Sequence, residues 1–295
     1  MDVLASPQLL FSALVLGSVY ALIALGLNLV YGTMRLLNIA HGDVIMVGAY
    51  AAFWFFSLSG VSPLVGLPLI ALASACLGLL FYHAIFRHQL DNVRPVERVE
   101  ANSLLLFFGV SVIVQNTVAL AFTGSPRAYR HLDSVHELFG VAMTGNRIAV
   151  LVVAAALLSG VVLFLNRTHY GLSLSALIQN KTAARIVGID VSRIQLASFT
   201  AGFAIAGVSG ALVSMTEQIS PFMGFPFTIA AFVVIILGGL GNIRGGIAAG
   251  LLLGFVEIYV VVLTSANFRS ILLYGLFVGV LLLKPEGLFG KARHS

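Results

Sequence analysis

Charged residues are scarce in this 295-residue sequence: Asp, Glu, Lys and Arg make up only 9% of it, while 59% is hydrophobic. The mean hydropathy is +1.04. Water-soluble domains carry about 25% charged residues, so this composition excludes that class. The sequence therefore predicts an integral membrane protein.

Cysteine and several functional motifs are also missing. The single cysteine, Cys76, lies in an apolar stretch, so the chain has no internal disulfide framework. No phosphate-binding loop of the form G-x-x-x-x-G-K-[ST] occurs, and no set of Ser, His, Asp or Cys forms a catalytic or metal-binding pattern. We therefore expect no ATPase, no catalytic residues, no metal and no cofactor in this chain.

What the sequence does contain is a series of nine apolar stretches. Most run to about 20 residues, enough for a helix to cross a hydrocarbon layer of about 30 Å. They lie at residues 8–30, 36–57, 63–86, 101–123, 148–165, 194–214, 221–241, 247–264 and 270–284. The polar segments between them are too short for a soluble domain. The predicted fold class is an all-α polytopic bundle of about 8–9 transmembrane helices, forming a single domain over residues 1–295.

Basic residues are unevenly divided between the two sides of this bundle. If the chain starts outside and crosses nine times, twelve of its sixteen Lys and Arg residues fall on one side and four on the other. The twelve are Arg35, Arg87, Arg94, Arg98, Arg167, Lys181, Arg185, Arg193, Arg244, Lys284, Lys291 and Arg293, and the four are Arg127, Arg130, Arg147 and Arg269. Because cytoplasmic loops are rich in Lys and Arg, the side with twelve is predicted to be cytoplasmic, with the N-terminus outside and the C-terminus inside. Stretches 36–57 and 221–241 are interrupted by Gly, Pro or polar residues, so either could be a re-entrant or broken helix.

The longest basic loop, at about 166–193, contains an amphipathic segment. The run GLSLSALIQNKTAARIVG, from Gly171 to Gly188, mixes apolar and polar residues and has no proline. It predicts one cytoplasmic helix of about four turns that ends at Gly188. The pattern leaves open whether this helix rests on the membrane surface or docks against another protein.

Five blocks spread over nearly the whole chain carry a family resemblance. They are YALIALGLNLVYG, RLLNIAHGDVIMVGAY, AARIVGID, PFMGFPFTIAAFVVIILGGLGNIRGGIAAGLLLGFVE and LLLKPEGLFG. In this order they resemble the permease subunits of bacterial ABC importers for branched-chain amino acids. The resemblance implies an inner-membrane permease that forms the translocation path for small hydrophobic amino acids. It also implies that Ala183, Ala184 and Gly188 belong to the coupling helix, which docks into an ATPase subunit.

The same resemblance implies a set of partners. These are a second homologous permease subunit, two ATPase subunits that use ATP and Mg, an extracytoplasmic solute-binding protein and the lipid bilayer, with no nucleic acid. Related permeases also serve urea, amides and other small solutes, so the substrate remains open within that range. An ion-coupled secondary transporter is the alternative, since it would also be a polytopic bundle and could use Asp43 and Glu257 for ion coupling.

Polar residues inside apolar stretches are the remaining candidates for function. Asn38, His41, Gly42 and Asp43 lie in LNIAHGDVIMVGAY, which we interpret either as a bend near the cytoplasmic end of the second crossing or as part of the translocation path or its gate. Glu257 should face protein or water, because a charge at bilayer depth costs about 2.5–3.5 kcal/mol. It would make either a hydrogen bond within the bundle or a contact with substrate.

Two further patterns concern helix packing. Gln115 and Asn116 are expected to join helices as polar contacts. Small residues recur every four positions at Ser198, Gly202, Ala206, Gly210 and Ser214, and again at Gly238, Gly246, Gly250 and Gly254 with Asn242 in the remaining place. Both series predict faces where helices pack closely, or slide past each other during transport.

Overall fold

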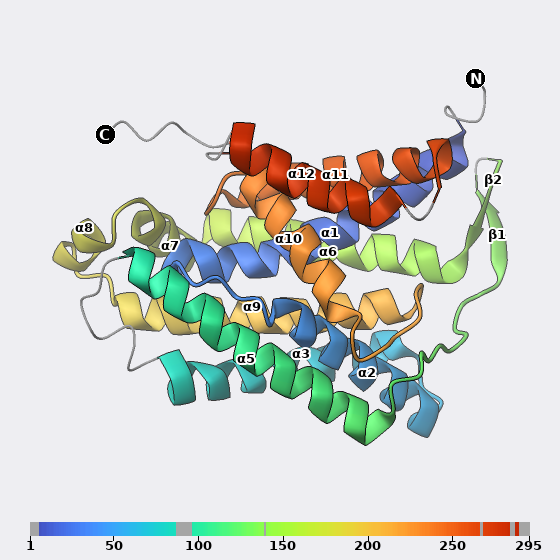
Figure 1. The fold of residues 1–295 in the computed structure, drawn as a ribbon, viewed down its shortest axis with the longest axis horizontal. Helices are drawn as coiled ribbons and strands as arrows, with labels where there is room; N and C mark the ends of the chain where they lie inside the picture. The colour runs from blue at the N-terminus through green and yellow to red at the C-terminus, as the bar shows by residue number, and fades with distance from the viewer. Residues whose placement is uncertain (1–5, 87–95, 139, 266–267, 284–286, 289–295) are drawn as a thin grey trace.

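The computed structural model describes residues 6–86, 96–138, 140–265, 268–283 and 287–288, most of them helical (Figure 1). The elements are α1 (Pro7–Met34), α2 (His41–Ser59), α3 (Pro63–Phe81), the π-helix η1 (Tyr82–Phe86), α5 (Val96–Phe122), β1 (Val135–Leu138), β2 (Val141–Thr144), α6 (Gly145–Arg167), α7 (His169–Gln179), α8 (Lys181–Ile186), α9 (Val191–Ser214), α10 (Gly224–Leu237), α11 (Ile243–Leu263) and α12 (Phe268–Leu283). The prediction of an all-α polytopic membrane protein is confirmed. The sequence analysis did not anticipate the small antiparallel hairpin of β1 and β2.

Nine of these helices each overlap one of the nine predicted apolar stretches, with ends that differ by up to five residues. Seven helices of the described chain are long and apolar enough to cross a membrane, namely α1, α2, α3, α5, α6, α9 and α11. Helix α10 has 14 residues and α12 has 16. Both are therefore shorter than the usual spanning length of about 17–25 residues.

The nine helices run alternately in opposite directions along the long axis of the molecule (Figure 1). Helix α1 begins at the end that carries β1 and β2, called here the hairpin end, and α12 finishes at the opposite end, called the α7–α8 end. Because of this alternation, the described residues among the twelve basic ones predicted to be cytoplasmic lie at the α7–α8 end. They are Arg35, Arg98, Arg167, Lys181, Arg185, Arg193 and Arg244. The other five, Arg87, Arg94, Lys284, Lys291 and Arg293, lie outside the described residues.

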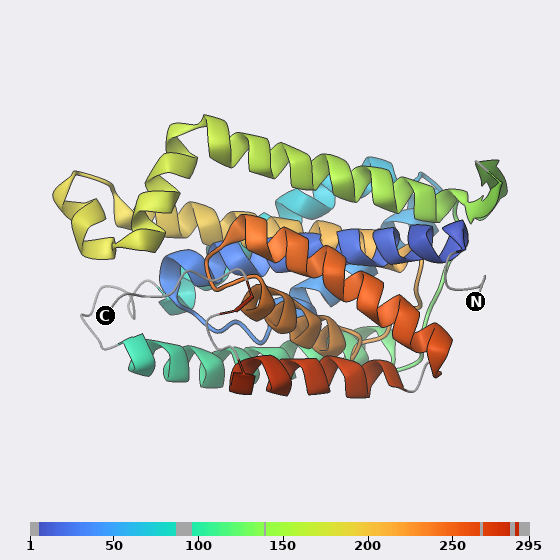
Figure 2. The same cartoon turned by 90° about the horizontal axis from the view of Figure 1, so that it is seen from above.

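Helices α1 and α9 form the centre of the bundle, with the other helices around them (Figure 2). Helix α1 is apolar on all sides and buried from Val15 to Met34 apart from Leu16, as expected for a helix surrounded by protein. Helices α3, α5 and α6 instead leave much of their apolar surface exposed. Such surface is stable only against lipid or another apolar partner.

The small residues of α9 lie where it crosses α1 and α2. A Cβ atom at Gly202 would lie 2.7 Å from the backbone oxygen of Gly26, and one at Gly210 would collide with the backbone oxygen of Ile45. On α11, a Cβ atom at Gly250 would lie 2.6 Å from the Cα atom of Ala21. These helices therefore approach each other backbone to backbone, which any larger side chain would prevent.

Helix α2 begins deep inside the bundle, and this corrects the expected position of the bend. Arg35 ends α1 in a left-handed conformation (φ 55°), and the chain then runs without helical structure to His41. The His41 ring Nε2 lies 3.1 Å from the carbonyl oxygen of Ile23, which is eleven residues before Met34 at the end of α1. At about 1.5 Å per residue, His41 therefore lies about 16 Å inside the α7–α8 end rather than close to it.

The predicted single helix from Gly171 to Gly188 is two helices, α7 and α8, so this prediction was wrong in its detail. The break is at Asn180, whose side chain accepts hydrogen bonds from the backbone N–H groups of Thr182 and Ala183, both at 3.0 Å. Asn is a strong N-cap residue, so it starts a new helix where the pattern of apolar residues predicted continuity. The predicted stop at Gly188 matches a positive φ of 85°, which glycine adopts without strain.

Candidate functional site

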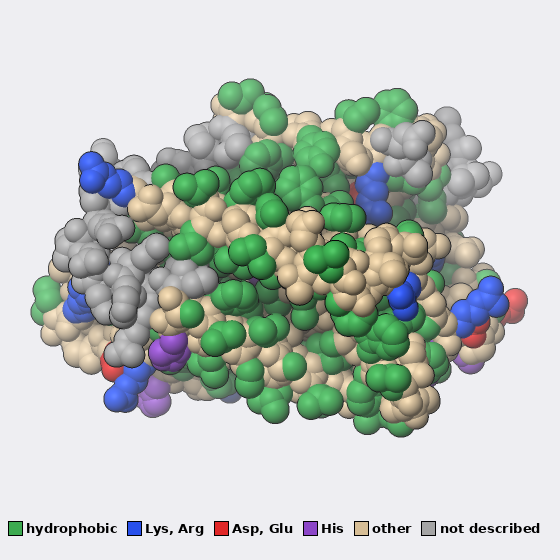
Figure 3. All heavy atoms as spheres, turned by 60° about the horizontal axis from the view of Figure 1, so that its bottom comes forward, with side chains coloured by type: hydrophobic (Ala, Val, Ile, Leu, Met, Phe, Trp, Pro, Cys, Tyr) green, Lys and Arg blue, Asp and Glu red, His purple; other side chains and the backbone are tan. Residues whose placement is uncertain are grey.

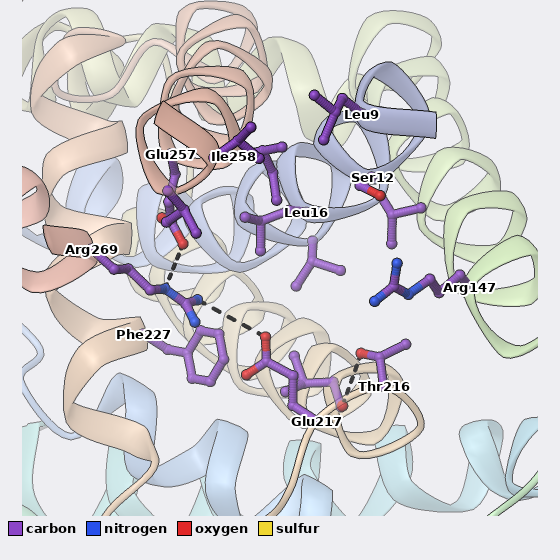
Figure 4. Close-up of a pocket in the computed structure, with 15 residues that line it drawn as sticks. Leu9, Ser12, Leu16, Arg147, Thr216, Glu217, Phe227, Glu257, Ile258 and Arg269 are labelled. Atoms are coloured by element: carbon purple, nitrogen blue, oxygen red, sulfur yellow. Dashed lines mark hydrogen bonds and ion pairs between the residues drawn. The ribbon is translucent and has the colours of Figure 1, made fainter. Parts of the chain in front are cut away.

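A cavity of about 330 Å³ opens at the hairpin end, and we call it the Glu257 cavity (Figure 4). It lies between the first half of α1, the end of α9, the start of α6, the second half of α11 and the first turn of α12, with Phe227 of α10 also in its wall. Most of its wall is aliphatic, with Leu9, Val15, Leu16, Val19, Val213, Ile258, Val261 and Val262. Its polar residues are Ser12, Arg147, Thr216, Glu217, Glu257 and Arg269.

Glu257 lies in this wall as part of a network with Tyr20 and Arg269. Its side chain is 2% exposed, and its Oε1 lies 2.5 Å from Arg269 Nε. The Tyr20 hydroxyl donates a hydrogen bond to Glu257 Oε2 at 2.7 Å, and Arg269 Nη2 donates to the Tyr20 hydroxyl oxygen at 3.1 Å. The buried carboxylate thus faces protein and a cavity, with its charge paired.

Two more charged groups face the open part of the cavity. Glu217 lies 3.9 Å from Arg269 Nη2, and the two side chains are 40% and 38% exposed. Figure 4 shows Arg147 on the opposite side from Arg269, with its guanidinium turned toward the cavity. The cavity therefore combines an aliphatic wall with both positive and negative groups, which suits a small molecule that is apolar at one end and zwitterionic at the other.

The bend in front of α2 is buried, and its polar atoms are only partly paired. Asn38 and His41 are both 0% exposed. Within the described part of the chain, both amide atoms of Asn38 and the Nδ1 atom of His41 have no hydrogen-bond partner. Backbone groups around Gly42 are not bound by these side chains. Instead the Gly42 N–H donates to Thr228 Oγ1 at 2.9 Å.

The hydrogen bond between Gly42 and Thr228 belongs to a close contact between the starts of α2 and α10. A Cβ atom at Gly42 would collide with the backbone oxygen of Gly224, and one at Gly224 would lie 2.5 Å from the backbone oxygen of Gly42. Thr228 donates its hydroxyl to the carbonyl oxygen of Ile39 at 3.1 Å. The starts of α2 and α10 therefore meet inside the bundle, as in transporters built from discontinuous helices.

Asp43 points away from His41 and toward α5, as the spacing of two residues on a helix requires. Gln115 Nε2 donates to Asp43 Oδ1 at 2.9 Å, so Gln115 does join two helices. Asn116 does not: it is exposed and donates to the carbonyl oxygen of Val112 in its own helix at 2.7 Å. The prediction that Asn116 joins helices was wrong because its side chain points outward.

The predicted coupling residues lie at the far end of the molecule from the Glu257 cavity. Ala183 is exposed, but Ala184 is 2% exposed and packs inside the chain. The exposed apolar side chains beside them are Ile186, 81% exposed, and Val187, 73% exposed. A docking partner would meet these two residues rather than Ala184.

Tyr20, Arg147, Glu217 and Arg269 are the site residues that sequence reasoning missed. One signal was present, because a buried carboxylate requires a partner, and Arg269 follows Glu257 within one helical hairpin. No comparable signal marked Tyr20, which lies 237 residues from its partner Glu257. Only the packing of α1 against α11 brings them together.

The alternating apolar helices, the helix starts inside the bundle and the charged cavity together define a membrane transport subunit. Residues 9–281 match the model of the family described as "Branched-chain amino acid transport system / permease component". The chain belongs to this family.

Two of the relatives are similar over nearly their whole lengths, and a third over about two thirds of its length. The high-affinity branched-chain amino acid transport system permease protein BraD of Pseudomonas aeruginosa is 32% identical, over 96% of this chain and 95% of that protein. The probable branched-chain amino acid transport permease protein LivH of Methanocaldococcus jannaschii is 31% identical, over 97% of this chain and 93% of that protein. The corresponding LivM protein of Salmonella typhimurium is 30% identical over 93% of this chain and 68% of that protein. No solved structure matches the chain.

Proposed function

We propose that this chain is the membrane-spanning permease subunit of an ABC importer for branched-chain amino acids. The observation that carries the proposal is the match to the permease family over residues 9–281. Two permeases named for branched-chain amino acids align with 96% and 97% of this chain. The same alignments span 95% and 93% of those permeases.

The Glu257 cavity supports this substrate class. An amino acid with an aliphatic side chain carries one positive and one negative group close together and a branched apolar tail. Its carboxylate would pair with Arg147, its ammonium group with Glu217, and its side chain with the wall around Leu16. Glu257 and Arg269 already satisfy each other at 2.5 Å, so we assign to them the shaping of the cavity, while the more exposed Glu217 and Arg147 meet the substrate.

The orientation follows from the distribution of basic residues. We propose that the α7–α8 end faces the cytoplasm, because the described Lys and Arg residues are concentrated there and cytoplasmic loops carry that excess. The N-terminus and the Glu257 cavity then face outside, where an extracytoplasmic binding protein would deliver substrate. The C-terminus is cytoplasmic, and the whole chain acts as a single membrane domain.

Energy would enter at the α7–α8 end, through two partner ATPase subunits that use ATP and Mg. We propose that the exposed apolar residues Ile186 and Val187 contact them, together with Ala183. Burial, and then the charge of Arg185, lower the pKa of Lys181 at the start of α8. A second permease subunit completes the assembly, in line with the two differently named kinds of permease among the relatives, LivH and LivM.

The test is reconstitution in lipid vesicles. The permease, its partner permease, the ATPase subunits and the binding protein are purified and combined, and the uptake of leucine and the hydrolysis of ATP are measured. We expect leucine to stimulate hydrolysis and to enter only with ATP on the ATPase side. Accumulation of leucine by the permease alone on a proton or sodium gradient would instead establish the ion-coupled alternative.

A further inference from the structure

Polar contacts join α5 to the α1–α2 connection and to α2. Near the start of α5, Ser103 Oγ accepts a hydrogen bond from the backbone N–H of Leu37 at 3.1 Å. Further along, Gln115 Nε2 donates to Asp43 Oδ1 at 2.9 Å. The two contacts are about 18 Å apart along the helix. They set the position of α5, and the apolar side chains between α5 and the bundle pack only as far as that position allows.

A cavity of about 280 Å³ lies behind α5, between α2, α3 and α9, and we call it the α3–α5 cavity. Most of its wall is aliphatic or aromatic, including Val44, Val47, Leu77, Phe107, Val114 and Phe203. Its two polar lining residues are engaged elsewhere. The Asp43 carboxyl interacts with Gln115 and Ser111, and its remaining oxygen is buried. The Thr117 hydroxyl donates to the carbonyl oxygen of Ile113 at 2.7 Å. The cavity therefore offers a ligand apolar contact alone.

The α3–α5 cavity is continuous with the lipid-facing surface of the protein. Leu77 of α3 and Val114 of α5 are half-buried in its wall, and Ile113 is 67% exposed. The lining residues of α5 lie about 6–22 Å before the end of that spanning helix, which is hydrocarbon depth. Figure 3 shows a face of the molecule with hydrophobic side chains over its middle and most basic side chains toward its ends. The mouth of the cavity therefore meets the apolar part of the bilayer rather than water.

We propose that the α3–α5 cavity holds a hydrocarbon chain of a bilayer lipid. Water does not fill a cavity of this kind, because apolar cavities stay dry. An empty cavity would leave the side chains of its wall without partner atoms on one side, so they would lose dispersion contacts. A lipid chain restores these contacts, is abundant at the mouth, and brings no polar group that needs a partner.

This lipid chain is distinct from the proposed substrate of transport. An amino acid carries an ammonium group and a carboxylate, and burying both in the α3–α5 cavity without partners would be costly. The α3–α5 cavity also shares no lining residue with the Glu257 cavity. The proposal rests on the position of the chain in a membrane and not on the identity of the substrate. Its test therefore uses neither ATP nor leucine.

The experiment maps where a lipid chain touches the permease, assembled with its partner subunits in lipid nanodiscs. The probe is a phosphatidylcholine with a photoreactive diazirine midway along one acyl chain. A second phosphatidylcholine, with the diazirine beside the glycerol, is the control for depth. After illumination, mass spectrometry of the digested permease locates the attached lipid.

The decisive residues are those that lipid can reach only through the cavity. We expect the mid-chain probe to label Val44 and Phe203, which are 6% and 1% exposed. Lipid that merely surrounds the protein reaches Ile113 but not these two residues. The control probe should leave both unlabelled, because the mouth of the cavity lies below the glycerol region.

Two variants fill the mouth from different helices. Val114→Phe enlarges a side chain of α5, and Leu77→Phe enlarges one of α3, so either should abolish the labelling of Val44 and Phe203. Labelling of the exposed face of α6 should persist in both. Leu105→Phe is the matched control, since Leu105 is 73% exposed on α5 and does not line the cavity. Because the two filling variants lie on different helices, the test stays decisive if one of them does not fold.

Three results would overturn the proposal. Labelling confined to exposed residues, with none at Val44 or Phe203, would mean that the cavity is closed or that the partner permease covers it. Unchanged labelling of these two residues in both filling variants would mean that lipid reaches them by another path. Equal labelling by the mid-chain probe and the control probe would place the mouth at the wrong depth.

Discussion

Arg269 Nε lies 2.5 Å from Glu257 Oε1, so the first turn of α12 is tied to the middle of α11 by an ion pair. The two partners are unequal, because Glu257 is 2% exposed while Arg269 is 38% exposed. The Tyr20 hydroxyl adds α1 to the same contact. Three helices are therefore held together by one buried carboxylate.

This inequality predicts unequal effects of removing either partner. Arg269→Met leaves the buried Glu257 carboxylate without its cation and should lower the free energy of unfolding by about 3–5 kcal/mol. Glu257→Gln leaves a partly exposed guanidinium, which water can solvate, and should cost less. Thermal unfolding of the purified variants in detergent measures both, and the double variant should recover part of the loss. A larger loss in Glu257→Gln than in Arg269→Met would contradict the ion-pair description.

A second prediction concerns substrate contact at the Glu257 cavity. Glu217→Gln removes a partly exposed charge, so we expect the apparent KM for leucine to rise about fivefold, equivalent to about 1 kcal/mol, without a change in thermal stability. Gln218→Ala is the matched control, since Gln218 is the exposed neighbour and does not line the cavity. Uptake in reconstituted vesicles measures the KM. Equal values for the two variants would remove Glu217 from the substrate site.

The third prediction separates docking from folding at the α7–α8 end. Val187 is 73% exposed, so Val187→Glu should leave the permease folded but release the ATPase subunits, because it strands a charge in an apolar contact. Ala184→Glu should instead reduce the yield of folded permease, since Ala184 packs inside the chain. Leu132→Glu, an exposed leucine at the hairpin end, is the control. Normal co-purification of the ATPase subunits with Val187→Glu would refute the docking surface.

The fourth prediction tests the close contact between α1 and α9. Gly202→Leu should lower stability by about 1–3 kcal/mol, because the backbone of Gly26 occupies the space that the new side chain needs. Gly160→Leu on α6 is the matched control, since nothing lies within 4 Å of a Cβ atom there. Yield and thermal unfolding report the difference. Similar values for the two variants would mean that α1 and α9 can separate without cost.

The fifth prediction fixes the orientation in the membrane. In a Cys76→Ser background, a cysteine at Lys181 should be protected from an impermeant thiol reagent added to intact cells, and a cysteine at Arg130 should react. Arg94 is expected on the same side as Lys181, although it lies outside the described residues. Labelling of position 181 from outside would reverse the orientation and with it the docking assignment.

The sequence by itself determined the class of fold. A long apolar stretch in a bilayer becomes a helix because its backbone N–H and C=O groups must form hydrogen bonds within the stretch. Each of the nine predicted stretches accordingly contains a helix. Small residues at every fourth position of α9 also predicted close packing from the sequence alone. Residues spaced by four lie on the same face of a helix, and small side chains on that face let another helix approach closely. The family resemblance rested on the same local blocks.

Local pattern could not decide where a helix starts when a side chain or a tertiary contact competes with it. Asn180 divides one amphipathic pattern into α7 and α8 through hydrogen bonds of its own side chain. Helix α2 starts inside the bundle because His41 lies against Ile23 and Gly42 against Gly224. Both partners are distant in the sequence, and nothing in the segment itself specifies them.

The pairing of charges was decided by tertiary structure alone. The sequence placed Asp43 in a bend and Glu257 inside an apolar stretch, but it specified a charged partner for neither of them. The fold brings Tyr20 and the cation Arg269 to Glu257, and it brings the uncharged side chains of Gln115 and Ser111 to Asp43. Glu257 is therefore paired with a cation and Asp43 with uncharged groups, because the helices that pack against each carboxyl decide its partners.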